Sequence, residues 1–353
     1  MNQTRLGEIL GSFSTRRIAV VGDFFLDKYL LIDSELNEPS VETGLTAYQI
    51  VGKRRSPGAA GTVVNNLKAL GIGTVYAVGM TGVDGEGLEL RMELTRLGVE
   101  QEHFYAVEER FTPTYTKPLM LEKSDKHEII EREINRFDIK NRKPLPSWIE
   151  YQLEKAIEEV AEKVDAIMVM DQVAERNCGV ITDRIRESIA AQGRKNCPAI
   201  IYADSRNRIS EYRDVLIKCN HYEVVSPFYP EFDRLTGSLK DAEPSKEQII
   251  ESGFKTAKRT GRPVFVTLGK LGQWVFDGDE LRKVPAIEVS GPIDICGAGD
   301  AASSGIVAAL CAGASYEEAA FIGNCAASIT IKQLGCTGTA TVGQISDVYR
   351  STV

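Results

Sequence analysis

Residues 294–300 read Asp294-Ile295-Cys296-Gly297-Ala298-Gly299-Asp300, and a run of small residues follows directly, up to Cys311. Two glycines around one alanine permit a tight turn, and the run after them predicts a helix over 298–311. Backbone N–H groups of such a turn meet the positive end of the helix dipole, which favours binding of an anion. Asp300 lies in the first helical turn, where its carboxylate could accept a proton from a hydroxyl or could simply cap the helix.

Short apolar segments alternate with helical patterns along most of the chain. The predicted strands are Arg17–Gly22, Thr74–Val78, Ala166–Met170, Ala199–Ala203, Tyr222–Val225 and Val264–Leu268, with a hairpin at 273–284. The predicted helices include Leu88–Leu97, Trp148–Val164, Val180–Ala191, Glu247–Arg259 and Tyr316–Lys332. Strands that alternate with helices predict an α/β fold with a mainly parallel central sheet, covered by helices on both faces.

Two segments, at about 31–51 and 103–134, interrupt this rhythm with short stretches of alternating polar and apolar residues. Such alternation is typical of a sheet with one exposed face, so these segments predict a small β-strand lid on one edge of the larger sheet. No repeat, low-complexity tract or flexible linker divides the chain. We therefore expect a single domain over residues 1–353.

The composition narrows the range of partners. The chain has 353 residues, 43% of them hydrophobic and 26% charged, and its formal net charge of −8 disfavours nucleic acid and anionic membranes. Its seven cysteines form no C-x-x-C pair and are odd in number, so they predict free thiols in a reducing compartment. No apolar run approaches the roughly 20 residues of a membrane span, and the N-terminus lacks the apolar core of a signal peptide. We therefore expect a cytoplasmic protein.

The stretch 294–300 resembles the C-terminal signature of the PfkB/ribokinase-like carbohydrate kinases, usually written D-T-x-G-A-G-D, with Ile295 at the Thr position. Further motifs of that family occur in the expected order. They are Gly22-Asp23 with Asp27, Pro57–Gly61 with Asn66, Val78–Gly87, Lys218–Glu223 and Val266–Gly272. Ordered motifs from Arg17 to about Gly338 are far more specific than any one of them. The resemblance implies a ribokinase-like three-layer sandwich and an ATP-dependent kinase of a sugar or sugar phosphate.

The family signature also implies how the turn at 294–300 would work. Asp300 would be the catalytic base that deprotonates the acceptor hydroxyl. The backbone of Gly297, Ala298 and Gly299 would form an anion hole for the phosphoryl group in transfer. Phosphoryl transfer needs mainly positioning and charge neutralisation, so this modest set of groups is sufficient.

The resemblance assigns a second set of residues to the nucleotide and its metal, namely Asn220, Glu223, Thr267, Gly269, Gly272 and Asn324. Asn220 and Glu223 would organise Mg²⁺ through water, since hard oxygen donors suit that ion. The two glycines would let the backbone approach ATP, and Asn324 would border the adenine. Read alone, Glu223 could be a solvated surface acid and Asn324 a buried, capped amide. Some relatives also use a monovalent cation.

A third set of residues, from the N-terminal half, would bind the acceptor: Asp23, Asp27, Gly58, Ala59, Asn66, Lys117 and Asp171. The aspartates could accept hydrogen bonds from sugar hydroxyls, and Gly58 would let the sugar lie close to the backbone. Asp27 could instead form a surface pair with Lys28, and Lys117 could be a solvated residue of the lid. In many relatives a partner chain covers the lid, so we expect a homodimer through it.

Within the family, the sequence is most similar to the heptose 7-phosphate kinase branch. The shared stretches are GDFFLDKY, PGAAG, TYTKP and the KLGCTGT-like segment at 332–339. Two departures stand out. Thr62 replaces the usual Asn, and residues 170–175 keep only Asp171 of the branch's S-D-Y-x-K-G. The missing lysine would weaken binding of a phosphorylated sugar, unless Arg206 or Arg176 supplies the charge.

Two other functions are alternatives to a kinase. A dinucleotide-dependent oxidoreductase should carry G-x-G-x-x-G after its first strand, but the strand at 17–22 is followed by Asp23-Phe24-Phe25. A non-catalytic regulator that binds sugar or nucleotide fits the departures at Thr62 and after Asp171. The intact turn at 297–300 argues against it.

Overall fold

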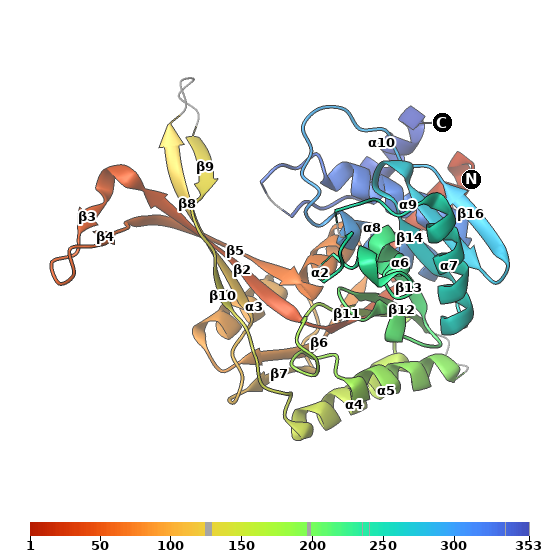
Figure 1. The fold of residues 1–353 in the computed structure, drawn as a ribbon, viewed down its shortest axis with the longest axis horizontal. Coiled ribbons are helices and arrows are strands. Elements are labelled where there is room, and N and C mark those ends of the chain that lie inside the picture. Colours follow the sequence, from red (N-terminus) through yellow and green to blue (C-terminus); the bar gives the residue numbers. More distant parts are fainter. Residues whose placement is uncertain (124–128, 196–198, 235, 240, 336, 353) are drawn as a thin grey trace.

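A computed structural model describes residues 1–353 except 124–128, 196–198, 235, 240, 336 and 353. Its centre is a nine-stranded sheet in the order β16-β15-β14-β13-β12-β11-β1-β6-β7 (Figure 1). The bounds are β1 Arg17–Gly22, β6 Thr74–Gly82, β7 Phe104–Val107, β11 Ala166–Asp171, β12 Ile200–Ser205, β13 Leu216–Asn220, β14 Val264–Thr267, β15 Gln273–Asp277 and β16 Glu280–Val284. The strands from β14 through β7 pair in parallel, and the β15–β16 hairpin adds an antiparallel edge.

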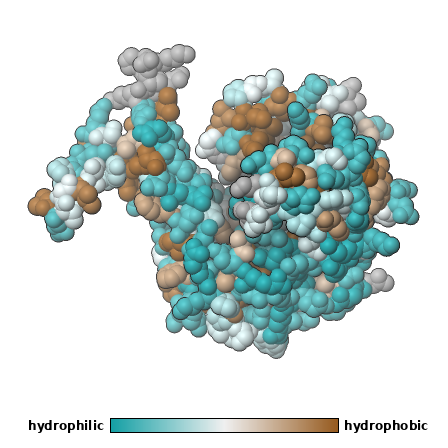
Figure 2. Space-filling view, in the orientation of Figure 1, coloured by the Kyte–Doolittle hydropathy of each residue, from teal (hydrophilic) through white to brown (hydrophobic). Residues whose placement is uncertain are grey.

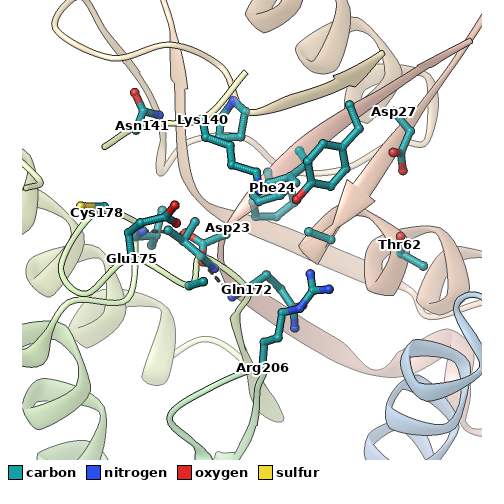
Figure 3. Close-up of a pocket in the computed structure, with 18 of the residues that line it drawn as sticks. Asp23, Phe24, Asp27, Thr62, Lys140, Asn141, Gln172, Glu175, Cys178 and Arg206 are labelled. Atoms are coloured by element: carbon teal, nitrogen blue, oxygen red, sulfur yellow. Dashed lines mark hydrogen bonds between the residues drawn. The ribbon is translucent and has the colours of Figure 1, made fainter. Parts of the chain in front are cut away.

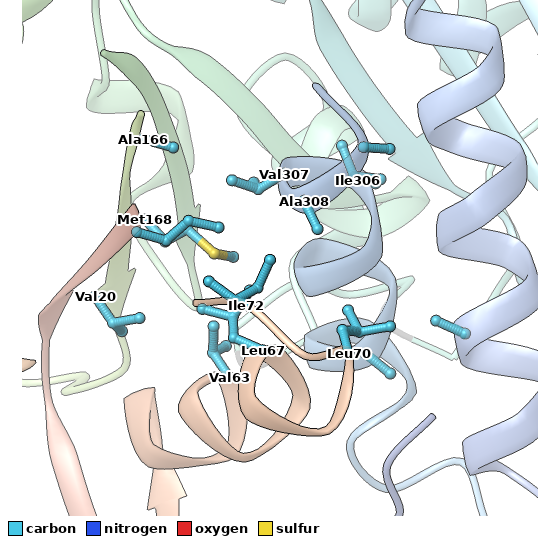
Figure 4. Close-up of a cluster of buried hydrophobic side chains, with 14 of the residues drawn as sticks. Val20, Val63, Leu67, Leu70, Ile72, Ala166, Met168, Ile306, Val307 and Ala308 are labelled. Atoms are coloured by element: carbon cyan, nitrogen blue, oxygen red, sulfur yellow. The ribbon is translucent and has the colours of Figure 1, made fainter. Parts of the chain in front are cut away.

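Helices cover both faces of this sheet, which confirms the predicted α/β class. They are α1 Gln3–Gly11, α2 Ala60–Ala69, α3 Gly85–Arg96, α4 Ser147–Ala161, α5 Asp183–Arg194, α6 His221–Val225, α7 Lys246–Thr260, α8 Ala298–Cys311, α9 Tyr316–Thr330 and α10 Val342–Thr352. Alternate residues of β1 enter two separate cores: Ile18 and Val20 pack with α2 and α8, whereas Ala19 and Val21 pack with α4 and α5. Figure 4 shows α2 and α8 meeting over β1 and β11.

A second, five-stranded sheet extends from the main body at the end of β1 (Figure 1). Its strands are β2 Phe24–Asp33, β5 Ile50–Ala59, β8 Thr114–Lys123, β9 Ile129–Glu133 and β10 Phe137–Ile139. A small hairpin, β3 Glu38–Pro39 with β4 Thr46–Ala47, prolongs it at its far end. The chain passes between the sheets at Gly22, where a side chain is sterically excluded because a Cβ would lie 2.2 Å from the Met170 carbonyl oxygen.

This second sheet differs in extent from the lid predicted at 31–51 and 103–134. It begins at Phe24 and continues to Ala59, because β2 and β5 pair along almost their whole length. The predicted segment also contained Phe104–Val107, which instead pairs with β6 in the central sheet. The part of the predicted lid at 124–128 lies outside the described residues.

The strand predicted at Tyr222–Val225 is wrong, because these residues lie in α6. The Asn220 side chain accepts hydrogen bonds from the backbone N–H groups of Tyr222 and Glu223, and the Glu223 carboxylate accepts one from the Asn220 N–H. This reciprocal capping box starts a helix despite the β-branched residues that follow. Helix α10 was also missed, since its apolar contacts Ile345 and Tyr349 become evident only in the folded core.

The described cysteines Cys178, Cys219, Cys296, Cys311 and Cys325 are free, as predicted. Cys197 and Cys336 lie outside the described residues. No helix in the described part of the chain is long and apolar enough to cross a membrane.

Candidate active site

A cavity of about 460 Å³ lies between the five-stranded sheet and the main body. We call it the inter-sheet cavity. Residues of β2 and β8 line one side, and the loop 172–180 and the start of α8 line the other. Figure 2 shows the molecule hollowed between these two parts, and Figure 3 shows polar side chains from both entering the space.

Helix α8 begins at this cavity without a side-chain cap. Its N-cap is Gly297, in the left-handed region at φ +77°, and a Cβ there would lie 2.6 Å from the Thr337 methyl group. The N–H groups of the first helical turn have no acceptor within the helix. The Ala298 N–H donates to the Ile295 carbonyl at 3.2 Å, and the other N–H groups of this turn remain available to an anion in the cavity. The anion hole at Gly297, Ala298 and Gly299 stays a prediction.

Asp300 lies half-buried in the first turn of α8 and lines the inter-sheet cavity. Burial and the neighbouring Asp204 together raise the pKa of its carboxyl to about 7, against the effect of Lys218. A carboxylate with a pKa near neutrality is suited to accept a proton at physiological pH. The structure thus brings Asp300 and the open helix terminus together at one wall.

A buried ion pair lies directly beneath this wall. The Lys218 ammonium is 2.7 Å from the Asp204 carboxylate, and both side chains are at most 9% exposed. A Cβ on Gly299 would lie 3.0 Å from the Lys218 ammonium, so only glycine fits there without displacing it. Ser303 of α8 donates a hydrogen bond to Asp204 and accepts one from Tyr202.

Sequence reasoning assigned no role to this ion pair. Lys218 was visible within the Lys218–Glu223 motif, and Asp204 follows an apolar strand. Their contact with each other, and with Gly299, depends on parallel pairing of β12 with β13, which places Asp204 opposite Lys218.

On the acceptor side, Asp27 and Lys117 face the cavity from adjacent strands, 3.8 Å apart. Burial raises the pKa of Asp27, and the Lys117 ammonium opposes that effect. Gly58 is required beside them, because a Cβ there would lie 2.4 Å from the Asp27 carboxylate. Ala59 lines the cavity and adopts φ +53°, a strained value for a residue with a side chain.

Asp23 lines the cavity, but its carboxylate is already engaged by the loop 172–180. It accepts hydrogen bonds from the backbone N–H groups of Gln172, Val173 and Val180. Burial and the neighbouring Asp171 raise the pKa of Asp23 to about 6, against the effect of these hydrogen bonds. In this structure Asp23 therefore fixes the shape of the loop that forms one wall of the cavity.

Three predicted acceptor residues, Gly58, Asn66 and Asp171, lie outside the cavity lining. Asn66 is 1% exposed and donates to the Thr62 carbonyl within α2. Asp171 is equally buried, and its carboxylate accepts hydrogen bonds from Ser205 and Arg208. The sequence placed Asn66 within a helix and Asp171 at a strand end, but it could not show which way their side chains point.

Two of the predicted nucleotide residues, Asn220 and Glu223, line a neighbouring cavity of about 500 Å³, which we call the α6 cavity. It is lined by residues 206–210, the start of α6 and residues from 226–236, and it includes Asn220 and Glu223. Burial and Asp204 raise the pKa of Glu223, whereas Lys218 and the N–H of Asn220 oppose the shift. No cluster of three or more acidic, cysteine or histidine side chains able to hold a metal occurs among the described residues.

The other predicted nucleotide residues stabilise the adjoining edge of the central sheet, around β14, β15 and β16. They are Thr267, Gly269, Gly272 and Asn324. Gly269 and Gly272 have φ of +55° and +87°, and a Cβ on Gly272 would lie 2.2 Å from the Val284 carbonyl oxygen. The Asn324 amide donates to the carbonyls of Val284 and Pro285 and accepts from Gln273, so it holds the segment after β16 against α9. Thr267 donates to the Cys219 carbonyl.

Comparison with known protein families matches most of the chain. The family model described as "pfkB family carbohydrate kinase" matches residues 17–341. The chain belongs to this family. As a family member it is a carbohydrate kinase, and the resemblance inferred from the ordered motifs is confirmed.

Named relatives of this carbohydrate kinase include two called Bifunctional protein HldE. The one from Desulfatibacillum aliphaticivorans is 28% identical over 342 residues, which cover 94% of this chain and 62% of that protein. The one from Syntrophotalea carbinolica is 27% identical over 360 residues, which cover 98% of this chain and 66% of that protein. The chain thus spans less than two thirds of the length of these curated relatives.

Solved structures support the fold of the kinase. Phosphofructokinase-2 from Escherichia coli in complex with potassium superposes with a TM-score of 0.68 at 17% identity, covering 95% of this chain and 98% of that one. Arabidopsis thaliana ribokinase, complexed with ribose and ATP, gives a TM-score of 0.63 at 17% identity, covering 94% and 98%. The predicted ribokinase-like fold is confirmed.

Proposed function

We propose that this carbohydrate kinase transfers the γ-phosphoryl group of ATP to a hydroxyl of a sugar or sugar phosphate bound in the inter-sheet cavity. The observation that carries the proposal is the start of α8, where the Asp300 carboxylate and uncapped N–H groups share one wall of that cavity. Asp300 would accept the proton of the attacking hydroxyl, and the backbone of 297–299 would bind the phosphoryl oxygens.

The binding of Mg²⁺ is part of the same proposal. One Glu223 oxygen is used by the capping box, which leaves the other for the α6 cavity. Mg²⁺ commonly keeps several waters and takes further ligands from nucleotide phosphates, so a single protein carboxylate with Asn220 nearby fits the ion. When bound, the ion would neutralise charge on the phosphates; the residues of this chain would orient it.

The acceptor we propose first is a heptose 7-phosphate or a similar sugar phosphate. Of the two arginines that could replace the missing lysine, Arg206 lines the inter-sheet cavity. Arg176 instead pairs with Asp183 at 2.9 Å and with Glu211 at 3.0 Å. A sugar phosphate would therefore meet Arg206 and not Arg176.

A coupled assay of ADP release tests the proposal with ribose, fructose 6-phosphate and a heptose 7-phosphate, each with and without K⁺. We expect phosphorylation of at least one acceptor and loss of activity in Asp300→Asn with the fold retained. ATP binding without phosphorylation of any acceptor would instead favour a non-catalytic regulatory relative. Full activity in Asp300→Asn would refute the mechanism.

We also propose that two copies pair through the five-stranded sheet. Large apolar side chains on this sheet and its hairpin are exposed, namely Leu36, Val41, Leu45, Tyr48, Ile50, Val51, Ile130 and Phe137. Burial of such a surface would stabilise a dimer. Light scattering of the wild type and of Ile50→Lys would test the pairing, with a monomeric wild type as the contradictory result.

A further inference from the structure

Arg206 lies at the junction of the two cavities. It and Asn207 are the described residues that line both the inter-sheet cavity, with Asp300, and the α6 cavity, with Asn220 and Glu223. The Arg206 side chain is exposed, and Figure 3 shows it extending from its loop into the inter-sheet cavity. A group that moves from one cavity to the other along this shared lining would meet it.

The guanidinium of Arg206 has no hydrogen bond or ion pair within the described part of the chain. The other cations that line the inter-sheet cavity are already engaged: Lys117 lies 3.8 Å from Asp27, while Arg136 and Lys140 lie 2.7 and 3.7 Å from Asp138. Arg206 is thus the lining cation whose donors remain available to a ligand, while its charge opposes the raised pKa of the nearby Glu223 carboxyl.

The backbone that presents Arg206 is rigidly held. Its N–H donates to the Asp171 carbonyl at 3.0 Å. The buried Asp171 carboxylate accepts from the Ser205 hydroxyl at 2.8 Å and from Arg208 at 2.9 Å, and the Arg208 N–H donates back to Ser205. Asp171 therefore positions the turn that carries Arg206, which accounts for its burial away from the cavity.

The surroundings of Arg206 are rich in carboxylates. Asp300 and Glu223 lie on either side of the junction, and Lys218 is already paired with Asp204. An anionic phosphoryl group entering this region would be repelled unless a cation met it. An arginine can contact two phosphoryl oxygens at once through its planar fork of donors.

We propose that Arg206 binds the phosphoryl group during its transfer between the two cavities; the proposal rests on the kinase function proposed above. In this step the acceptor oxygen forms a bond to the γ-phosphorus of ATP, and the bond from that phosphorus to the β,γ-bridging oxygen breaks. The acceptor proton passes to Asp300, and the electron pair of the broken bond leaves on ADP. Arg206 donates hydrogen bonds to oxygens of the moving group throughout.

The first test needs no knowledge of the natural acceptor. ADP with aluminium fluoride imitates the phosphoryl group in transfer, and calorimetry compares its binding with that of ADP alone in the presence of Mg²⁺. We expect the wild type to gain affinity from aluminium fluoride, and Arg206→Met to lose most of that gain while its affinity for ADP stays within about twofold. An undiminished gain in Arg206→Met would overturn the proposal.

The second test uses whichever panel acceptor the wild type phosphorylates. We expect Arg206→Met to lower kcat about 100-fold or more, with both KM values within about threefold, and Arg206→Lys to recover part of the loss. Arg213→Met, an exposed arginine outside both cavities, should leave kcat unchanged. Equal thermal midpoints would show that the variants fold.

The alternative source of the phosphate is the acceptor itself. If Arg206→Met raised only the KM of phosphorylated acceptors and left kcat intact, Arg206 would bind the acceptor's own phosphate and the proposal would be wrong. If the wild type phosphorylated no acceptor and gained nothing from aluminium fluoride, the proposed kinase function would fail, and this inference with it. An active wild type with an unaffected Arg206→Met would remove the inference alone.

Discussion

Helices α6 and α8 begin close together, yet only α6 has a side-chain cap at its N-terminus. Helix α6 carries a complete capping box, in which Asn220 and Glu223 satisfy the backbone N–H groups of its first turn. Helix α8 starts at Gly297 with no side-chain cap. Asp300, in the first turn of α8, receives no hydrogen bond on its carboxylate from the described residues. Lys218, two residues before Asn220, lies beside the other helix, with its ammonium 3.0 Å from where a Cβ on Gly299 would be.

The difference shows which terminus can serve which part of the chemistry. A capped terminus has consumed its donors, so α6 can contribute only the remaining side-chain oxygens, which suit a hydrated cation. An uncapped terminus keeps its donors and its positive potential, so α8 can bind anionic oxygens.

The largest effect is expected from Asp300→Asn. Loss of the base should reduce kcat by about 10³-fold, within the usual contribution of general base catalysis. Glu317→Gln is the matched control, since it removes an exposed acid from the first turn of α9, which lies outside both cavities. Steady-state kinetics with the active acceptor measure both variants, and a loss below tenfold in Asp300→Asn would contradict its role.

Gly297→Ala should be the next most damaging change. Gly297 has φ +77°, and a Cβ there would clash with the Thr337 methyl group. The turn must therefore shift, and its N–H groups would no longer point into the cavity. We expect kcat to fall roughly 10- to 100-fold and the free energy of unfolding by about 1–2 kcal/mol.

Gly313→Ala separates these two effects. Gly313 lies just beyond the other end of α8, also at φ +77°, with nothing within 4 Å of a Cβ. It should lose similar stability in chemical denaturation while kcat stays unchanged. Equal losses of kcat in both variants would show that backbone strain, and not the direction of the N–H donors at 297–299, lowers kcat.

Glu223→Gln tests the α6 terminus. It retains an acceptor for the Asn220 N–H but removes the charge that would attract Mg²⁺, so we expect the Mg²⁺ concentration for half-maximal rate to rise about tenfold. Glu318→Gln makes the same change in the capping box of α9 and should leave the Mg²⁺ requirement unaltered. The rate measured over a range of Mg²⁺ concentrations tests this, and an unaltered Mg²⁺ requirement in Glu223→Gln would contradict it.

The smallest effects concern pH. Because the pKa of Asp300 is raised to about 7, kcat/KM should fall about tenfold per unit below that pH and level off above it. The folded chain keeps the proton between the unfolded value of 3.8 and about 7, so this carboxyl lowers stability as pH rises through that window. Asp300→Asn should therefore exceed the wild type in thermal midpoint above pH 7, and the gap should close near pH 4.

The sequence alone determined the alternation of strands and helices and the family to which the chain belongs. Apolar runs such as Arg17–Gly22 identify buried strands whatever their neighbours, because their periodicity is a local property. The glycines at 297–299 likewise predicted an open helix terminus, since only the backbone they permit exposes N–H groups there.

Tertiary structure decided where the side chains point. Asp23 and Asp171 follow adjacent strands and look alike in sequence, yet Asp23 holds the loop of the cavity wall and Asp171 is buried behind it, fixing the turn of Arg206. The Lys218–Asp204 pair and the position of Arg206 between two cavities arise from the order of β11, β12 and β13 in the sheet. Strand order is set by long-range packing, which no local pattern in the sequence encodes.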